Sequence, residues 1–214
     1  MGKSFFHGKT VWFGLGINDV NFQNLISIFR ESLINAGIDD DCIIPYDCLH
    51  ISLAKFSLDN SDLKDYTTFE IISSVLNLTL EKFKNKINNI KINNMSYGHA
   101  SRSVKLNFAD ESFDLISKIR NFIIEKANDY GLSLNNERLF YPHVTLLDQM
   151  HSSLTYTDGH IIKRFVYEYQ NKFRFQSVKL TNIKILTPRL SLHTEDKAMR
   201  DLAKLLTVDF TPKE

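Results

Sequence analysis

The sequence predicts a mixed fold of helices and strands that consists of two similar halves. Segments rich in β-branched and aromatic residues, typical of strands, alternate with segments whose apolar residues recur at helical spacing. A shift of 93 residues, which carries His50 onto His143, overlays the first half on the second without a gap. The tripeptide His-x-Ser/Thr then occupies the same place in both halves. The 214 residues suffice to bury a core, so we expect a single domain over residues 1–214.

The first half is predicted to contain two strands and two helices. Thr10–Ile17 is a strand that ends at glycines. Asn18 and Asp19 can cap a helix that runs through Ile34, because apolar residues follow them every three or four positions. Cys48–Phe56 (CLHISLAKF) is the next strand, and a second helix runs from about residue 66 to residue 86.

The second half repeats this pattern. We expect strands at Ile90–Tyr97 and Arg102–Phe108, a helix with one apolar stripe at Phe113–Ala127, and a strand at Leu139–Leu147. Further along we expect a loop from Asp148 to about Gly159, one or two strands within Phe173–Leu186, and a short helix near Lys197–Leu206.

The overlay supports a structural duplication. It brings Val11 onto Val104, Phe22 onto Leu115, and the segment 49–53 (LHISL) onto 142–146 (PHVTL). In each copy a strand and a helix precede the strand that carries the tripeptide. We therefore predict two lobes, one with its motif at 49–53 and the other with its motif at 142–146.

Composition narrows the functional classes. The formal net charge of +1 at pH 7 argues against a duplex-DNA binder. No apolar run approaches the length of a membrane span. The two cysteines and seven histidines offer neither a disulfide framework nor zinc-type spacing. We expect a monomer in the cytoplasm, or alternatively the nucleus, that has no metal, no cofactor and no membrane partner.

The tripeptide His-x-Ser/Thr occurs four times, at 50–52, 99–101, 143–145 and 151–153. Only the first and third lie in predicted strands and in matching places of the repeat. In a strand, residues i and i+2 point to the same face, about 6–7 Å apart. We expect the two motif strands to face each other across a cleft, so that His50, Ser52, His143 and Thr145 surround one phosphate.

These four side chains suit cleavage of a phosphodiester. A neutral imidazole can remove a proton from the attacking oxygen while a protonated one donates a proton to the leaving oxygen. The two hydroxyls can donate hydrogen bonds to the non-bridging oxygens. A single strand histidine is more often structural, but two histidines in the same tripeptide and matching positions favour catalysis.

The motifs LHISLAKF and YPHVTLLD resemble those of the 2H phosphoesterase superfamily, also called LigT-like. The resemblance covers roughly residues 10–148. It implies a bilobal α+β fold with two antiparallel sheets that line a central cleft and with helices outside. It also implies metal-independent phosphodiester cleavage, with His50 and His143 as the acid/base pair and with Ser52 and Thr145 as phosphate-binding hydroxyls. Which histidine is the acid is left open.

Other residues are candidates for substrate contacts. Tyr141 shares a strand face with His143 and can either stack on a base or pack at a lobe edge. Trp12 and Lys105 occupy matching places in the overlay and are candidates for substrate binding, although a core position is favoured for Trp12. By strict alternation, Lys55 lies on the face opposite to His50.

Three functions remain open. The leading hypothesis is a phosphodiesterase of 2′-linked nucleotide messengers, of the 2′–5′ oligoadenylate or 2′,3′-cGAMP type, that blunts antiviral signalling. A second is an RNA 2′,3′-cyclic phosphodiesterase or 3′-end exonuclease. A third is a non-catalytic nucleotide- or RNA-binding module. In each case the partner is a small nucleotide or a short oligonucleotide.

Overall fold

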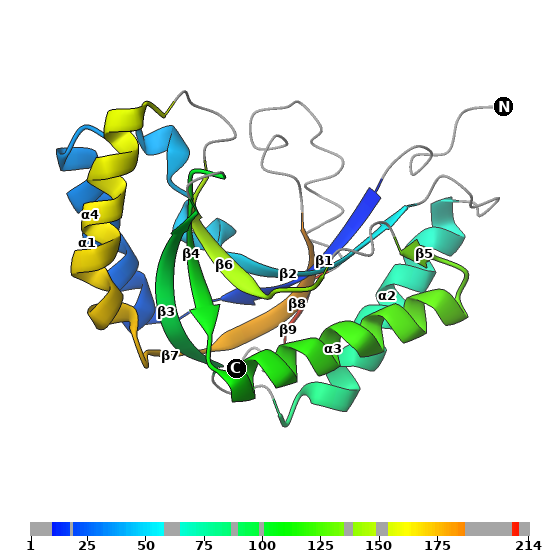
Figure 1. The fold of residues 1–214 in the computed structure, drawn as a ribbon. Coiled ribbons are helices and arrows are strands. Elements are labelled where there is room, and N and C mark those ends of the chain that lie inside the picture. The colour runs from blue at the N-terminus through cyan, green and yellow to red at the C-terminus, as the bar shows by residue number, and fades with distance from the viewer. Residues whose placement is uncertain are drawn as a thin grey trace, which may run out of the picture.

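A computed structural model describes residues 10–17, 19–57, 65–86, 90–98, 101–134, 139–148, 154–186 and 207–209. It has an antiparallel sheet with helices on its outside, as Figure 1 shows. The predicted α+β class is confirmed. Among the described helices, none has the length and apolar character that a membrane crossing requires.

The strands form one continuous sheet, in the order β7-β3-β4-β6-β2-β1-β8-β9, with β5 paired to β2. The two halves of the sheet meet where β2 and β6 pair through Ile51 and Val144. The two sheets expected from the resemblance are therefore joined along their inner strands. The strands are β1 Thr10–Ile17, β2 His50–Ser57, β3 Ile90–Gly98, β4 Ser103–Phe108, β5 Ser133–Leu134, β6 His143–Leu147, β7 Ser177–Val178, β8 Leu180–Leu186 and β9 Thr207–Asp209.

Each half contributes one helix, α1 or α3, that packs against the other half. α4 packs on β3 and α1 packs on α4, although α1 follows β1 in the chain. Conversely, α3 follows β4 but packs on β2 and β5, with α2 beside it. In Figure 1 the α1–α4 pair lies beside β3, and the α2–α3 pair lies below the other half of the sheet. The bounds are α1 Val20–Asn35, α2 Asp65–Phe83, α3 Asp110–Asp129 and α4 Tyr156–Phe173, with short 3₁₀ turns at Asp40–Cys42 and Tyr46–Cys48.

The repeat is present, but its copies do not superpose without gaps. Ser52 and Thr145 are equivalent residues of the two motifs. Ser52 pairs with Gly14 and Thr145 pairs with Lys105, so Gly14 and Lys105 occupy equivalent places in the first strands of the two copies. The offset from 14 to 105 is two residues shorter than the offset of the motifs, from 50 to 143. The predicted equivalence of Trp12 and Lys105 is therefore wrong, because the ungapped overlay misplaces the first strand.

Helix α4 was missed at the sequence level. The expected loop extends to about Gly159, but the helix already begins at Tyr156. Thr155 and Asp158 form a capping box at its start. Four buried residues then follow at helical spacing: Ile162, Val166, Tyr169 and Phe173. This pattern is detectable in the sequence. The helix expected near Lys197–Leu206 lies outside the described residues.

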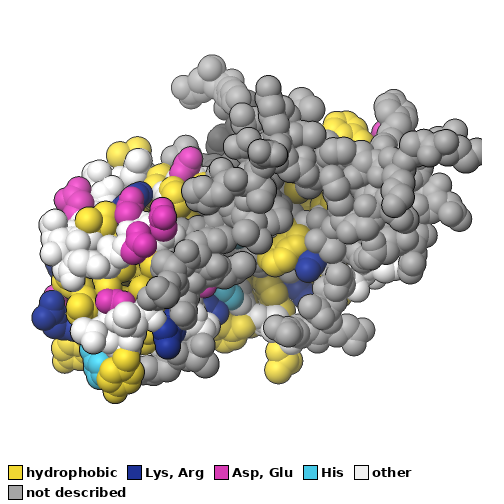
Figure 2. All heavy atoms as spheres, turned by 90° about the horizontal axis from the view of Figure 1, so that it is seen from above, with side chains coloured by type: hydrophobic (Ala, Val, Ile, Leu, Met, Phe, Trp, Pro, Cys, Tyr) yellow, Lys and Arg dark blue, Asp and Glu magenta, His cyan; other side chains and the backbone are white. Residues whose placement is uncertain are grey.

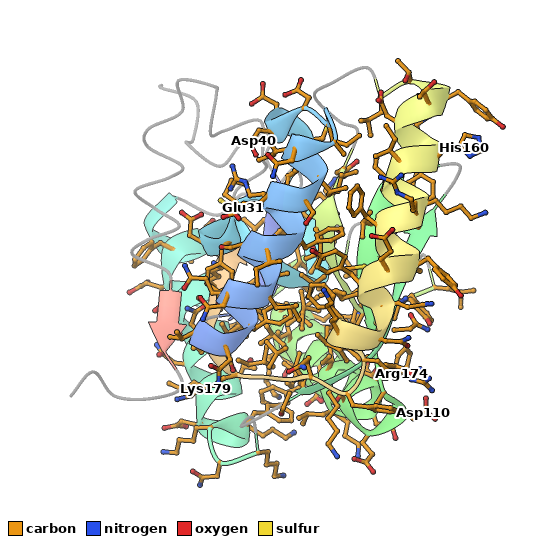
Figure 3. The ribbon with its side chains drawn as sticks, turned by 90° about the vertical axis from the view of Figure 1, so that its left-hand side faces the viewer. Glu31, Asp40, Asp110, His160, Arg174 and Lys179 are labelled. Carbon is orange, nitrogen blue, oxygen red and sulfur yellow. The ribbon has the colours of Figure 1, made fainter. Side chains whose placement is uncertain are left out.

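Helices α1 and α4 lie side by side and form one aromatic layer (Figure 3). The ring of Phe29 lies 5.3 Å from that of Tyr169 and 6.1 Å from that of Phe173, both edge to face. The hydroxyl groups of Ser32 and Tyr169 are 2.8 Å apart. Such edge-to-face pairs stabilise beyond the area that they bury, by about 0.5–1.5 kcal/mol each.

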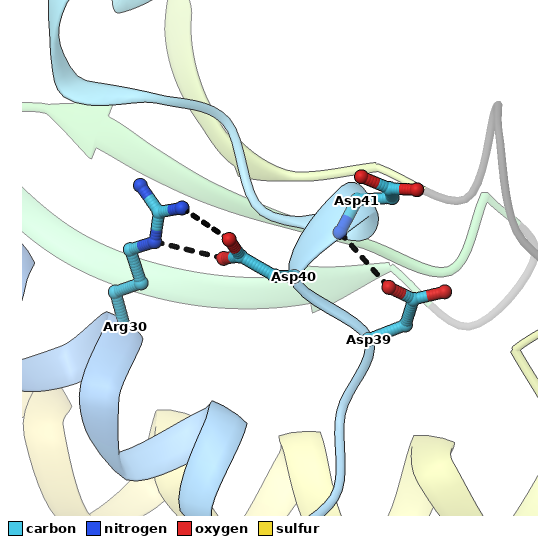
Figure 4. Close-up of polar contacts among 4 residues, drawn as sticks. All are labelled: Arg30, Asp39, Asp40 and Asp41. Atoms are coloured by element: carbon cyan, nitrogen blue, oxygen red, sulfur yellow. Dashed lines mark hydrogen bonds and ion pairs between the residues drawn. The ribbon is translucent and has the colours of Figure 1, made fainter.

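The chain between α1 and β2 is held by polar contacts, and Figure 4 shows those among Arg30, Asp39, Asp40 and Asp41. Arg30 donates from Nε and Nη2 to the two carboxylate oxygens of Asp40, at 2.8 and 2.5 Å. Asp39 accepts from the backbone N–H of Asp41 at 3.0 Å. The backbone N–H of Ile44 then donates to the carbonyl of Leu146 at 2.9 Å. These contacts lead the chain along β6 into the first motif.

Candidate active site

The two motifs lie on neighbouring strands. Because β2 and β6 run antiparallel through the Ile51–Val144 pair, the register sets His50 next to Thr145 and Ser52 next to His143. The histidines are then diagonal neighbours, for which the spacing is about 7–8 Å. The strands were expected to face each other across a cleft; they lie side by side in one sheet. We name the surface that carries these four side chains the motif face. Seen from above, most of the visible Asp and Glu side chains lie together at the left end of the molecule (Figure 2).

Both imidazole rings are fixed in the same way. His50 Nδ1 lies 2.8 Å from the carbonyl oxygen of Cys48, and His143 Nδ1 lies 2.8 Å from that of Tyr141. A carbonyl can only accept, so each Nδ1 carries the proton and donates it. The lone pair of each neutral ring is therefore on Nε2. This is the tautomer that a general base on the motif face requires.

The two imidazoles favour their neutral forms. Burial lowers the pKa of His50, the bond to the Cys48 carbonyl opposes this, and the charges of Lys184 and His143 lower it further. Burial likewise lowers the pKa of His143, the bond to the Tyr141 carbonyl opposes it, and Lys105 lowers it. Each ring thus has its own nearby lysine, and His50 also responds to His143.

A β-bulge changes which residues share the motif face in the first half. Phe13 pairs with Ala54 and Gly14 pairs with Ser52, so Leu53 is an extra residue on β2. Beyond the bulge, Lys55 pairs with Trp12, and its Nζ lies 5.0 Å from the centre of the Trp12 ring. Lys55 therefore lies on the same face as Ser52, against the prediction from alternation.

Arg120 from α3 holds this bulge. Its Nε donates to the carbonyl of Leu53 at 3.1 Å, and its guanidinium lies 4.7 Å from the ring centre of Phe140. Burial lowers the pKa of Arg120. Helix α3 thereby fixes the backbone that follows Ser52. Arg120 was not predictable as part of the site, because nothing in one sequence links it to residue 53.

Two glycines leave β1 without side chains beside Ser52 and His50 on the motif face. Gly14 lies between Ser52 and Lys184, and Gly16 lies between His50 and Asn182. A Cβ at Gly16 would overlap Oδ1 of Asn182, so the amide lies directly over this glycine. These glycines were expected to end the strand, but they lie within its paired part. Glycine inside a strand often marks a place where another group approaches the backbone closely. The two glycines were therefore the sequence feature that could have indicated the neighbouring strand β8.

The second half carries polar side chains where the first has glycines. Lys105 pairs with Thr145, and Asn107 pairs with His143. Asn107 Nδ2 donates to Asn94 Oδ1 at 2.6 Å and to Ser96 Oγ at 3.0 Å. These bonds make the motif face of β4 rigid beside the second motif.

The candidate substrate contacts differ in position. Lys105 lies beside the second motif. Tyr141 is 63% exposed, and its ring lies 5.9 Å from that of Phe113. Trp12 is 37% exposed on the edge of the motif face, against the favoured core position. Lys184 and Asn182 on β8 were not predicted.

Within the described residues, no group of three or more His, Cys, Asp and Glu side chains could hold a metal ion.

The chain matches one protein family and resembles several solved structures. Residues 10–197 match the family described as the AKAP7 2′5′ RNA ligase-like domain. No curated protein matches the chain. The MHV ns2 PDE domain has a similar fold, with a TM-score of 0.51 and 13% identity over 69% of this chain and 83% of that one.

Two other solved structures match with lower TM-scores. E. coli LigT complexed with 3′-AMP has a TM-score of 0.42 and 15% identity, over 82% of this chain and 85% of LigT. Kluyveromyces marxianus Usb1 with uridine monophosphate has a TM-score of 0.43 and 9% identity, over 82% of this chain and 92% of Usb1.

Proposed function

We propose that this chain, which belongs to the AKAP7 2′5′ RNA ligase-like domain family, cleaves 2′-linked nucleotide phosphodiesters with His50 and His143. The family places it among the 2H phosphoesterases, and the chain is a phosphodiesterase-type hydrolase. One observation carries the assignment of residues: both imidazoles lie on adjoining strands and each donates its Nδ1 proton to a backbone carbonyl.

The proposed reaction uses both rings through Nε2. The neutral imidazole removes a proton from the attacking water, whose oxygen forms a bond to phosphorus. The bond between phosphorus and the leaving oxygen breaks, and the protonated imidazole donates its proton to that oxygen. Ser52 and Thr145 donate hydrogen bonds to the non-bridging oxygens, where charge grows in the transition state. Solvent then removes the proton that the first ring gained and returns a proton to the ring that lost one.

The proposed substrates are 2′–5′ oligoadenylate or 2′,3′-cGAMP, and the proposed role is removal of such messengers in the cytoplasm during antiviral signalling. Support comes from the 2′5′ RNA ligase-like family and from lysines beside both histidines, which suit an anionic ligand. Tyr141, being exposed and two residues before His143, is proposed to stack on a base.

A substrate panel tests this function. The protein is incubated in EDTA with 2′–5′ triadenylate, 3′–5′ triadenylate, 2′,3′-cGAMP, adenosine 2′,3′-cyclic phosphate and an RNA with a 3′ oligouridine end, and the products are separated by chromatography. We expect cleavage of the 2′-linked substrates, with little cleavage of the 3′–5′ isomer. Preferential trimming of the RNA or opening of the cyclic phosphate would instead support RNA-end processing. Binding without turnover of any substrate would support a non-catalytic module.

A further inference from the structure

The side chain of Lys184 belongs to the motif face, although β8 carries neither motif. Lys184 pairs with Gly14, and Gly14 pairs with Ser52, so all three positions share one row across the sheet. Since paired residues in an antiparallel sheet point to the same side, Lys184 and Ser52 project in the same direction. Gly14 has no side chain between them, so nothing on β1 separates the lysine from the motif.

The surroundings of Lys184 suit a ligand anion. Its side chain is half-buried, and burial lowers its pKa, while Cys48 and the exposed Asp47 act in the opposite direction. No ion pair with Lys184 is present in the part of the chain that the structure describes. Removing an ammonium group from water is unfavourable unless a partner compensates for the loss of hydration. An anion bound on the motif face would supply that compensation.

Lys184 is too far from the motif strands to be part of the histidine pair itself. β8 is two strands from β2, a separation of about 9–10 Å between backbones. On the other side, Lys105 is only one strand from Thr145. The two lysines therefore lie on opposite sides of the histidines, and Lys184 is the more distant.

We propose that Lys184 binds a second phosphate of the substrate, next to the phosphodiester that the histidines cleave. This rests on the proposed function and makes it more specific. The substrate class is then one with at least two phosphates: an oligonucleotide with two or more linkages, a cyclic dinucleotide, or a 5′-phosphorylated dinucleotide. A nucleoside 2′,3′-cyclic monophosphate lacks the group that Lys184 would bind.

The test measures binding of two products or product analogues, adenosine 3′,5′-bisphosphate and 3′-AMP, by titration calorimetry. A charge-assisted contact with the additional phosphate should make the bisphosphate bind about tenfold more tightly. Lys184→Met should abolish this difference, and Lys184→Arg should keep most of it. Lys163→Met is the matched control, because Lys163 is an exposed residue of α4, and it should leave the difference unchanged.

The outcomes separate this proposal from the proposed function. An unchanged preference in Lys184→Met, or an equal loss of affinity for both ligands, would overturn the second-phosphate site. Should Lys184→Met fail to fold, as judged by circular dichroism, Lys184→Gln replaces it in the same titration. Because the titration requires no turnover, a preference that depends on Lys184 would stand even if the substrate panel showed no cleavage.

Discussion

The two halves of the motif face carry the same two groups, an imidazole and a hydroxyl, in different surroundings. In the first half, glycines on β1 leave space that Lys184 and Asn182 reach from the next strand. In the second half, β4 places Lys105 and hydrogen-bonded Asn107 directly beside the motif. The hydrogen bond from His50 Nδ1 to the Cys48 carbonyl is partly buried, whereas the bond from His143 Nδ1 to the Tyr141 carbonyl is exposed. The duplication thus preserves the His-x-Ser/Thr motif in both halves, while the neighbouring strands distinguish the two sides.

The largest expected effect tests whether the two histidines are equivalent. His50→Ala and His143→Ala should each lower kcat by about 10²–10⁴, because either proton transfer is lost. The double variant should be little worse than either single one, since the two groups act as a unit. Steady-state rates on the best substrate of the panel test this, with thermal unfolding as the control for folding. Near-normal activity of either variant would remove that histidine from the mechanism.

The two hydroxyl groups provide a second comparison between the halves. Ser52→Ala and Thr145→Val each remove one hydrogen-bond donor and should lower kcat by about 10². Ser52→Thr keeps a hydroxyl and serves as the matched variant, with much of the activity retained. Unequal losses, measured as kcat on the same substrate, would show that the phosphate lies closer to one motif than to the other.

Gly16 tests the glycine-lined half. Gly16→Ala places a Cβ on Oδ1 of Asn182 and should lower the free energy of unfolding by about 1–3 kcal/mol. The double variant Gly16→Ala/Asn182→Ala should recover much of this loss, because the overlapping group is gone. Urea denaturation of both variants and of Asn182→Ala completes the cycle. Additive effects of the two substitutions would exclude the contact as the cause.

The smallest expected effect is on pH dependence. Both histidines have lowered pKa values, so the free enzyme with one ring protonated and one neutral is most abundant below pH 6.5. We therefore expect kcat/KM to peak on the acid side of pH 6.5. Lys184→Met should raise the pKa of His50, and Lys105→Met should raise the pKa of His143, because each removes a nearby positive charge. Each substitution should therefore move one limb of the pH–rate profile to higher pH. Profiles identical to that of the unmodified protein would show that neither lysine acts on its ring.

Much of the fold was predictable because it depends on local patterns. The Asp19 cap of α1, the strand at Thr10–Ile17 and the two tripeptides are short-range features. α4 was equally local, since its capping box lies at Thr155, but the polar residues before it favoured a loop. The β5 pairing with β2 was not predictable from its two residues, because so short a strand exists only through its partner.

The same distinction between local and long-range features applies to the candidate site. The sequence by itself determined that two histidines, each followed by a hydroxyl two residues later, lie on strands in repeated units. Only the tertiary structure decided that these strands adjoin, that a bulge returns Lys55 to the motif face, that Arg120 holds this bulge, and that Lys184 faces Ser52 across a glycine. Side-chain spacing within a strand is set by its backbone, whereas pairing register and bulges depend on partners distant in the chain.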